Sequence, residues 1–194
     1  MKKKILSLLL SVLLCASLTA CSSSAPDNFQ EEAQTDVDNI NELPEPLYDH
    51  ISNDDYFDML TQYNDIFMDA MSIVSTNQVS TLISNDATIS DVIAEIDRVL
   101  SEIEISSSEL QGYYDTFNQN HSEAPMQTRI MTMLSYAQSA LTQYKMAMED
   151  LKWYLVTPNQ DYIDGFTEYA QKAQDSIEDY NTVLNEELSK LGKN

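Results

Sequence analysis

Apolar residues in the second half of the chain recur at alternating intervals of three and four positions. One such seam has spacings of 4-3-4-3-4-3-4 and consists of Ile130, Leu134, Ala137, Leu141, Tyr144, Met148, Leu151 and Leu155. A second seam consists of Ile163, Phe166, Ala170, Ala173, Ile177, Tyr180, Leu184, Leu188 and Leu191. A period of about 3.5 residues is typical of helices that pack against one another in bundles. The pattern therefore predicts two long packed helices.

The first half of the chain carries two weaker helical patterns, each with a polar gap. Apolar residues at helical spacing extend from Tyr56 to Leu82, with an interruption at residues 76–78 that predicts a kink or a break. A second set extends from Val92 to Phe117 and is interrupted by three serines at 106–108. We expect a local kink or an outward-facing turn at such gaps, rather than the border of a cavity.

Capping signals mark the ends of the predicted helices. Ser52…Asp55 and Thr88…Asp91 each resemble a capping box at a helix start. Pro125 falls in an expected first turn, where its missing N–H costs nothing. The last helix is predicted to have Thr157 as its N-cap and Pro158 as its first residue, and to end at Gly192.

Short connections near residues 85–88, 118–124 and 156–158 join these four predicted helices. Short connections make successive helices antiparallel neighbours. We therefore predict an all-α fold, an up-down-up-down four-helix bundle formed by residues 51–192. A three-helix bundle in which the first helix is broken is the alternative.

Composition and charge exclude several classes of function. The chain has 32 acidic and 10 basic residues, for a formal net charge of −22. This balance argues against a nucleic-acid partner, because such binding needs basic groups that displace counterions from phosphate. Only three glycines are present, which argues against glycine-rich phosphate loops.

The first twenty residues have the organisation of a secretory signal. Three lysines at 2–4 precede an apolar run of about ten residues, too short for a membrane-spanning helix, which needs roughly 20. Leu18-Thr19-Ala20-Cys21 follows and resembles the lipobox of bacterial lipoproteins. The resemblance implies cleavage after residue 20 and attachment of fatty acyl chains such as palmitate through a diacylglycerol on Cys21. The alternative is an ordinary signal peptide with an incidental cysteine.

Cysteine content agrees with lipidation. Cys15 lies in the predicted leader, so Cys21 would be the one cysteine of the mature chain. An unpaired cysteine in an exported protein needs an explanation, and lipidation supplies one. Two acyl chains anchor a protein stably where a single chain does not. The expected location is the extracytoplasmic face of a cell membrane. Removal of the three leader lysines would make the formal net charge −25.

Residues 21–50 form a predicted flexible, acidic tether. The segment is rich in Ser, Pro, Asp and Glu, and its few apolar residues show no period. Such a segment cannot bury enough surface to offset its chain entropy. The three predicted parts are thus a cleaved signal peptide (1–20), a tether (21–50) and a helical domain (51–192).

The sequence offers no catalytic residue, metal ligand or cofactor motif that we can nominate. A di-iron bundle needs Glu-x-x-His motifs, and neither His50 nor His121 follows a Glu at that spacing. No EF-hand loop and no G-x-S-x-G elbow occurs. The two seams described above contain no Asp or Glu, so they offer no carboxylate pair. We therefore expect a protein that is not an enzyme.

Aromatic residues gather near the predicted ends of the bundle. In an up-down-up-down arrangement, Trp153, Tyr154 and Tyr162 lie at the end far from the tether, where they are candidate anchors for a protein partner. The plainer interpretation is that these rings close the end of the core. Beyond the lipobox, the domain has only a general likeness to small helical-bundle lipoproteins of bacterial envelopes.

Three functional hypotheses follow from the sequence. The leading one is a lipid-anchored, non-enzymatic envelope lipoprotein that presents an acidic bundle to another protein. The second is a binding protein for a cationic solute or a divalent metal, which the negative field of the domain would concentrate. An enzyme on the same scaffold is the third.

Overall fold

The computed structural model describes residues 47–48, 51–120 and 124–193 of the chain. This part is all-α, with helices α2 (Asn53–Thr76), α3 (Val79–Ser84), α4 (Ile89–Asn120), α5 (Ala124–Val156) and α6 (Gln160–Lys190). The predicted leader, Cys21, most of the predicted tether, His50 and His121 lie outside the described residues.

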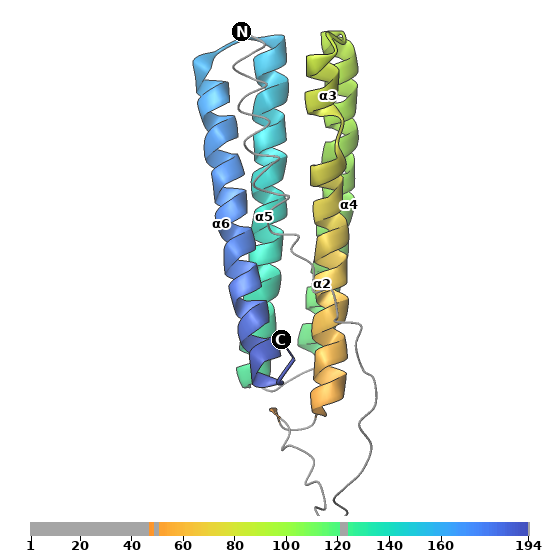
Figure 1. Cartoon of the computed structure of the whole chain (residues 1–194), viewed down its shortest axis with the longest axis vertical. Coiled ribbons are helices and arrows are strands. Elements are labelled where there is room, and N and C mark those ends of the chain that lie inside the picture. The colour runs from red at the N-terminus through yellow and green to blue at the C-terminus, as the bar shows by residue number, and fades with distance from the viewer. Residues whose placement is uncertain (1–46, 49–50, 121–123, 194) are drawn as a thin grey trace, which may run out of the picture.

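The helices form an up-down-up-down bundle, as the sequence predicts. Figure 1 shows α2 and α3 rising on one side, α4 returning behind them, and α5 and α6 forming a second antiparallel pair beside the first. The first of the four rods consists of α2 and α3 in succession. The longest helix, α5, has 33 residues and is about 50 Å long at a rise of about 1.5 Å per residue.

The break in the first rod falls where the polar gap predicts it. α2 ends at Thr76, and the buried Asn77 has an extended backbone. The Asn77 side chain bridges the break, because its amide nitrogen donates to the Val74 carbonyl and its oxygen accepts from the Val79 N–H at 3.1 Å. The Gln78 N–H donates to Oε1 of Glu95 on α4, at 2.8 Å. These bonds satisfy backbone groups that the break leaves open.

The second polar gap, where we expect a kink or an outward-facing turn, does not interrupt the helix. α4 continues as a single helix through residues 106–108. Ser106 is buried at 7% exposure, between the buried Ile103 and Leu110 on the inward face. Serine is small enough for Ser106 to occupy this inward position without breaking the helix. The next residue, Ser107, accepts a hydrogen bond from the Gln138 amide of α5.

The predicted caps of the first and second rods are confirmed at the level of single hydrogen bonds. Ser52 Oγ accepts from the Asp55 N–H at 3.1 Å. At the start of α4, Thr88 Oγ1 accepts from the Asp91 N–H while the Thr88 N–H donates to the Asp91 carboxylate, both at 3.2 Å. This reciprocal pair is a capping box. The third rod, α5, begins at Ala124 and has Pro125 in its first turn.

The predicted start of the last helix is wrong by two residues. Asn159, not Thr157, is the N-cap of α6, and its side-chain oxygen accepts from the Asp161 N–H at 3.2 Å. The Thr157 N–H donates to the Trp153 carbonyl at 2.8 Å and so completes the last turn of α5. Pro158 therefore lies in the connection instead of the helix. The predicted end is confirmed, because Gly192 follows the α6 cap with a φ of 69°.

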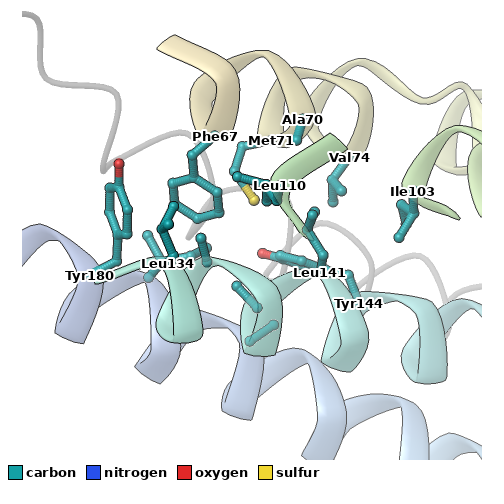
Figure 2. Close-up of a cluster of buried hydrophobic side chains, with 14 of the residues drawn as sticks. Phe67, Ala70, Met71, Val74, Ile103, Leu110, Leu134, Leu141, Tyr144 and Tyr180 are labelled. Carbon is teal, nitrogen blue, oxygen red and sulfur yellow. The ribbon is translucent and has the colours of Figure 1, made fainter. Parts of the chain in front are cut away.

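Two kinds of side chain set the distances between the helices. α5 and α6 are the closest pair in the described structure, and both carry buried alanines, among them Ala140, Ala147 and Ala173. Large rings fill the space between α2 and α6, where the ring centroids of Phe67 and Tyr180 lie 4.3 Å apart. Figure 2 shows these two rings beside the aliphatic side chains of the same core cluster.

Candidate functional site

The far end of the bundle carries a stacked aromatic pair. Trp153, near the end of α5, is 55% exposed, and its ring stacks on Tyr162 of α6 with centroids 6.5 Å apart. Tyr154 is half-buried and packs against the core instead. Of the three residues that the sequence nominates, Trp153 and Tyr162 therefore lie together, with Trp153 exposed and Tyr162 half-buried. The third closes the core, as the plainer interpretation expects.

Other apolar side chains are exposed at the same end. Ile89 begins α4 and is 56% exposed, and Val156 ends α5 and is 57% exposed. An ion pair between Lys152 and Asp97, at 2.5 Å, joins α5 to α4 near this end of the bundle. We call Ile89, Trp153, Val156 and Tyr162 the aromatic tip. It includes three of the five large apolar side chains that are exposed in the described part of the chain.

Acidic residues surround the aromatic tip. Those of the neighbouring turns are Asp86, Asp91, Asp97, Glu149, Asp150, Asp161 and Asp164. Burial raises the pKa of the Asp150 carboxyl, and the nearby Glu149 raises it further. A β-carbon at Gly165 would lie 2.1 Å from Oδ2 of Asp150, so the glycine gives this carboxylate its room against α6. The tip thus combines exposed rings with a negative rim.

A second cluster of polar residues lies at the opposite end of the bundle, where α2 begins and α6 ends. At its centre is Glu187, which is completely buried. Its carboxylate accepts hydrogen bonds from the hydroxyls of Tyr48 and Tyr56 at 2.8 and 2.9 Å. It also accepts from Arg129 Nε at 2.8 Å and from Lys190 Nζ at 2.5 Å. We call these five residues the Glu187 cluster.

The Glu187 cluster joins four segments of the chain. Tyr56 lies on α2, Arg129 on α5, and Glu187 and Lys190 on α6. Tyr48 precedes the first helix, in a stretch that the sequence analysis assigns to the tether. Next to it, the Leu47 N–H donates to Oδ1 of Asn53 at 2.7 Å. The contacts of the bundle therefore extend to the residues through which the chain enters it.

Hydrogen bonding keeps the Glu187 carboxylate ionised despite its burial. Burial alone raises the pKa of this group, but the hydrogen bonds from Lys190, Arg129 and the two tyrosines outweigh that effect and hold the pKa at about 2. Burial and the adjoining carboxylate raise the pKa of Tyr48 to about 12 and that of Tyr56 still further. These groups therefore keep one charge state near neutral pH, and their bonds join α2, α5 and α6 at this end of the bundle.

An open groove of about 1170 Å³ lies beside the Glu187 cluster. Arg129 and Lys190 are among the residues that line it. Both cations are paired, because Arg129 also binds the Glu186 carboxylate and Lys190 binds Glu187. The groove therefore presents compensated charges instead of a concentrated positive field.

Sequence reasoning missed Glu187 because it continued the last seam through Leu188. The strict alternation of three and four positions leads from Tyr180 and Leu184 to Glu187, not to Leu188. Glu187 is buried, whereas Leu188 is only partly buried. The signal was present in the spacing, but a carboxylate at a seam position is uncommon unless donors surround it.

Within residues 47–48, 51–120 and 124–193, no group of three or more His, Cys, Asp or Glu side chains is arranged to hold a metal ion. No helix in these ranges has the length and apolar character needed to cross a membrane. No protein-family model, curated protein or solved structure matches the chain.

Proposed function

We propose that this protein is a lipid-anchored, non-enzymatic module of a bacterial cell envelope that binds another protein through its aromatic tip. The chain is held by acyl chains on Cys21, and the segment up to residue 46 links this anchor to the bundle. Its molecular role is to present an acidic helical rod at a distance from the membrane.

The position of the aromatic tip carries this proposal. The chain enters the bundle at Asn53, at one end of the rod. The exposed Trp153, stacked on the half-buried Tyr162, lies at the other end, about 50 Å away along helices that rise about 1.5 Å per residue. Exposed Trp and Tyr are common anchors of protein interfaces. The acidic rim favours a partner with an apolar pocket bordered by Lys or Arg.

The state of Glu187 supports the non-enzymatic part of the proposal. Buried carboxylates that act as general acids or bases have a pKa near the working pH. Glu187 has a pKa of about 2 and four donors already in place. It is suited to holding helices together rather than to proton transfer.

Fatty-acid labelling tests the anchor. Cells expressing the full chain are fed an alkyne fatty acid, and the protein is recovered and coupled to a fluorophore. We expect a label on the wild type, none on Cys21→Ser, and a label on the matched control Cys15→Ser, because Cys15 lies in the predicted leader. An unlabelled wild-type protein that is recovered free of the membrane would refute the anchor.

Crosslinking in intact cells tests the aromatic tip. The full chain is compared with Trp153→Ala/Tyr162→Ala and with Ile105→Ala, an equally exposed apolar residue midway along α4, at 57%. We expect one crosslinked partner to be retained by Ile105→Ala, lost in the tip variant, and weakened by added salt because of the acidic rim. Identical partner patterns for all three proteins, or no partner at all, would contradict the tip as a docking site.

A further inference from the structure

A groove between α4 and α5, well below the aromatic tip, has polar walls and very little charge. It consists of two adjoining hollows of about 540 and about 620 Å³, which share Gln111, Gln138 and Thr142. We call it the seam groove. Ser107 and Ser108, from the serine gap at residues 106–108, form part of its α4 wall. This gap therefore borders a hollow, contrary to the expectation from the sequence.

The seam groove has an apolar floor and hydrogen-bonding walls. Its floor includes Leu110, Leu134 and Leu141, which are buried members of the hydrophobic core. Figure 2 shows these leucines among the buried side chains of the core cluster. Above the floor, the walls are formed mainly by Ser and Thr hydroxyls and Gln amides. Small-ligand sites commonly combine an apolar lining with a few polar groups that fix orientation.

The seam groove is electrically neutral in a strongly acidic protein. Two charged residues line it, Glu104 and Lys145, and they pair with each other at 2.6 Å at one end. The whole chain has a formal net charge of −22, so an uncharged stretch of this size is unusual. A charged ligand would have to give up its hydration for a wall that offers no opposite charge in return. The groove therefore favours an uncharged ligand.

Two amides of the groove have unmet hydrogen-bonding capacity. The side-chain oxygens of Gln138 and Gln143 are buried and have no donor in the described structure. Ser107 bonds one end of the Gln138 amide, so whichever way that amide is turned, its other end lacks a partner. Each unsatisfied buried polar group costs about 1–3 kcal/mol and calls for an explanation. Both oxygens face away from solvent, so a ligand reaches them only after the amides turn toward the groove, where ligand hydroxyls supply donors and acceptors.

We propose that the seam groove binds a neutral saccharide chain, with hydroxyls bonded to Gln111, Gln138 and Thr142 and a sugar ring against Tyr114. Tyr114 lines the end of the groove opposite the Glu104–Lys145 pair; it is half-buried and also packs against the core. An aromatic face beside amides and hydroxyls matches a sugar ring, which has apolar C–H faces and a polar edge. A docked protein helix is the less favoured occupant, because it would bring apolar anchors to walls that offer mainly polar groups.

Calorimetric titration of the full chain in mild detergent tests this site. The probes are two uncharged oligosaccharides, chitohexaose and maltohexaose, each taken to millimolar concentration. We expect saturable binding of at least one of them. Gln111→Ala/Tyr114→Ala should weaken that binding at least about tenfold, since one hydrogen bond and one ring contact together exceed the 1.4 kcal/mol of a tenfold change. Ser108→Arg, which fills the groove without removing a core side chain, should weaken it as well.

The matched control is Tyr169→Ala/Gln171→Ala, which removes the same two residue types from α6, away from the groove. It should bind the saccharide like the wild type, and circular dichroism should show every variant to be helical. The proposal is refuted if neither saccharide binds, or if the groove variants bind as tightly as the control. It is also refuted if the groove variants instead lose a protein crosslink, because a protein would then occupy the groove. The aromatic tip does not enter this test, so the two proposals fail independently.

Discussion

Replacing the buried carboxylate of Glu187 by an amide is the most informative perturbation of this fold. Glu187→Gln keeps the size of the side chain but removes the charge and turns one oxygen acceptor into a donor. The amide nitrogen would then face groups that are all donors, namely the two tyrosine hydroxyls, Arg129 and Lys190. Tyr56 is completely buried, so its hydroxyl cannot turn to water instead.

The pKa of Glu187 sets the size of the effect. It falls from 4.5 to about 2 on folding. At about 1.4 kcal/mol for each tenfold change in proton affinity, the ionised carboxylate contributes about 3 kcal/mol to the free energy of unfolding near neutral pH. Breaking a buried ion pair by removing one partner typically costs about 3–5 kcal/mol. We therefore expect Glu187→Gln to lower the free energy of unfolding by about 3 kcal/mol at pH 7.

The effect should depend on pH with a definite sign. A carboxyl group whose pKa is lowered by folding stabilises the protein above its unfolded pKa, and this stabilisation is lost as pH falls toward the folded pKa. The window therefore runs from pH 4.5 down to about pH 2. At pH 3 the carboxylate should retain about two fifths of its contribution, so the difference between wild type and Glu187→Gln should shrink by roughly 2 kcal/mol. Urea unfolding of both proteins, followed by circular dichroism at the two pH values, measures this difference.

Glu186→Gln is the matched control for this experiment. Glu186 adjoins Glu187 in sequence and binds the same arginine, but its side chain is 52% exposed. An exposed ion pair contributes roughly 0–1 kcal/mol, so we expect a loss in that range. Equal losses for the two variants at pH 7, or a loss in Glu187→Gln that does not change with pH, would show that the Glu187 cluster does not stabilise the bundle through its charge.

Two further predictions concern single atoms on helices. Gly112 lies inside α4, with no atom within 4 Å of where a β-carbon would be. Because alanine has the higher helix propensity, Gly112→Ala should raise the free energy of unfolding by about 0.5–1 kcal/mol. An unchanged free energy in urea unfolding would contradict this prediction. Tyr180→Phe removes a buried hydroxyl that has no partner in the described structure, so the free energy of unfolding should stay the same or rise. Tyr56→Phe removes a donor to Glu187 and should lower the free energy of unfolding by about 1–3 kcal/mol. A larger loss of stability in Tyr180→Phe than in Tyr56→Phe would contradict the conclusion that the Tyr56 hydroxyl has a stabilising partner and the Tyr180 hydroxyl has none.

Local chemistry explains why much of the fold follows from the sequence. The alternation of three and four positions defines the packed faces of α5 and α6 because a helix returns to one face every 3.6 residues. Ser52 and Thr88 act as caps through bonds to residues three positions later, so a short window of sequence contains both partners. The break at Asn77 is local for the same reason, since its side chain bonds within three residues on either side.

Contacts between distant segments were beyond this reasoning. Glu187 can be buried because Tyr48, Tyr56 and Arg129 donate hydrogen bonds to its carboxylate. These donors lie 139, 131 and 58 positions away in the chain, so only the folded bundle brings them to one carboxylate. From the sequence alone these donors are not known, so a glutamate at a seam position is predicted to be exposed. The neighbouring apolar residue, Leu188, is then predicted to occupy the packed position.

The sequence by itself determined the helices, their order and the acidic character of the surface, because periodicity, capping and charge are properties of neighbouring residues. Only the tertiary structure decided which aromatic rings stay at the surface, which carboxylate is buried, and where a neutral groove lies between α4 and α5. These features depend on the register of helices against one another, and that register follows from side-chain packing between residues far apart in the chain.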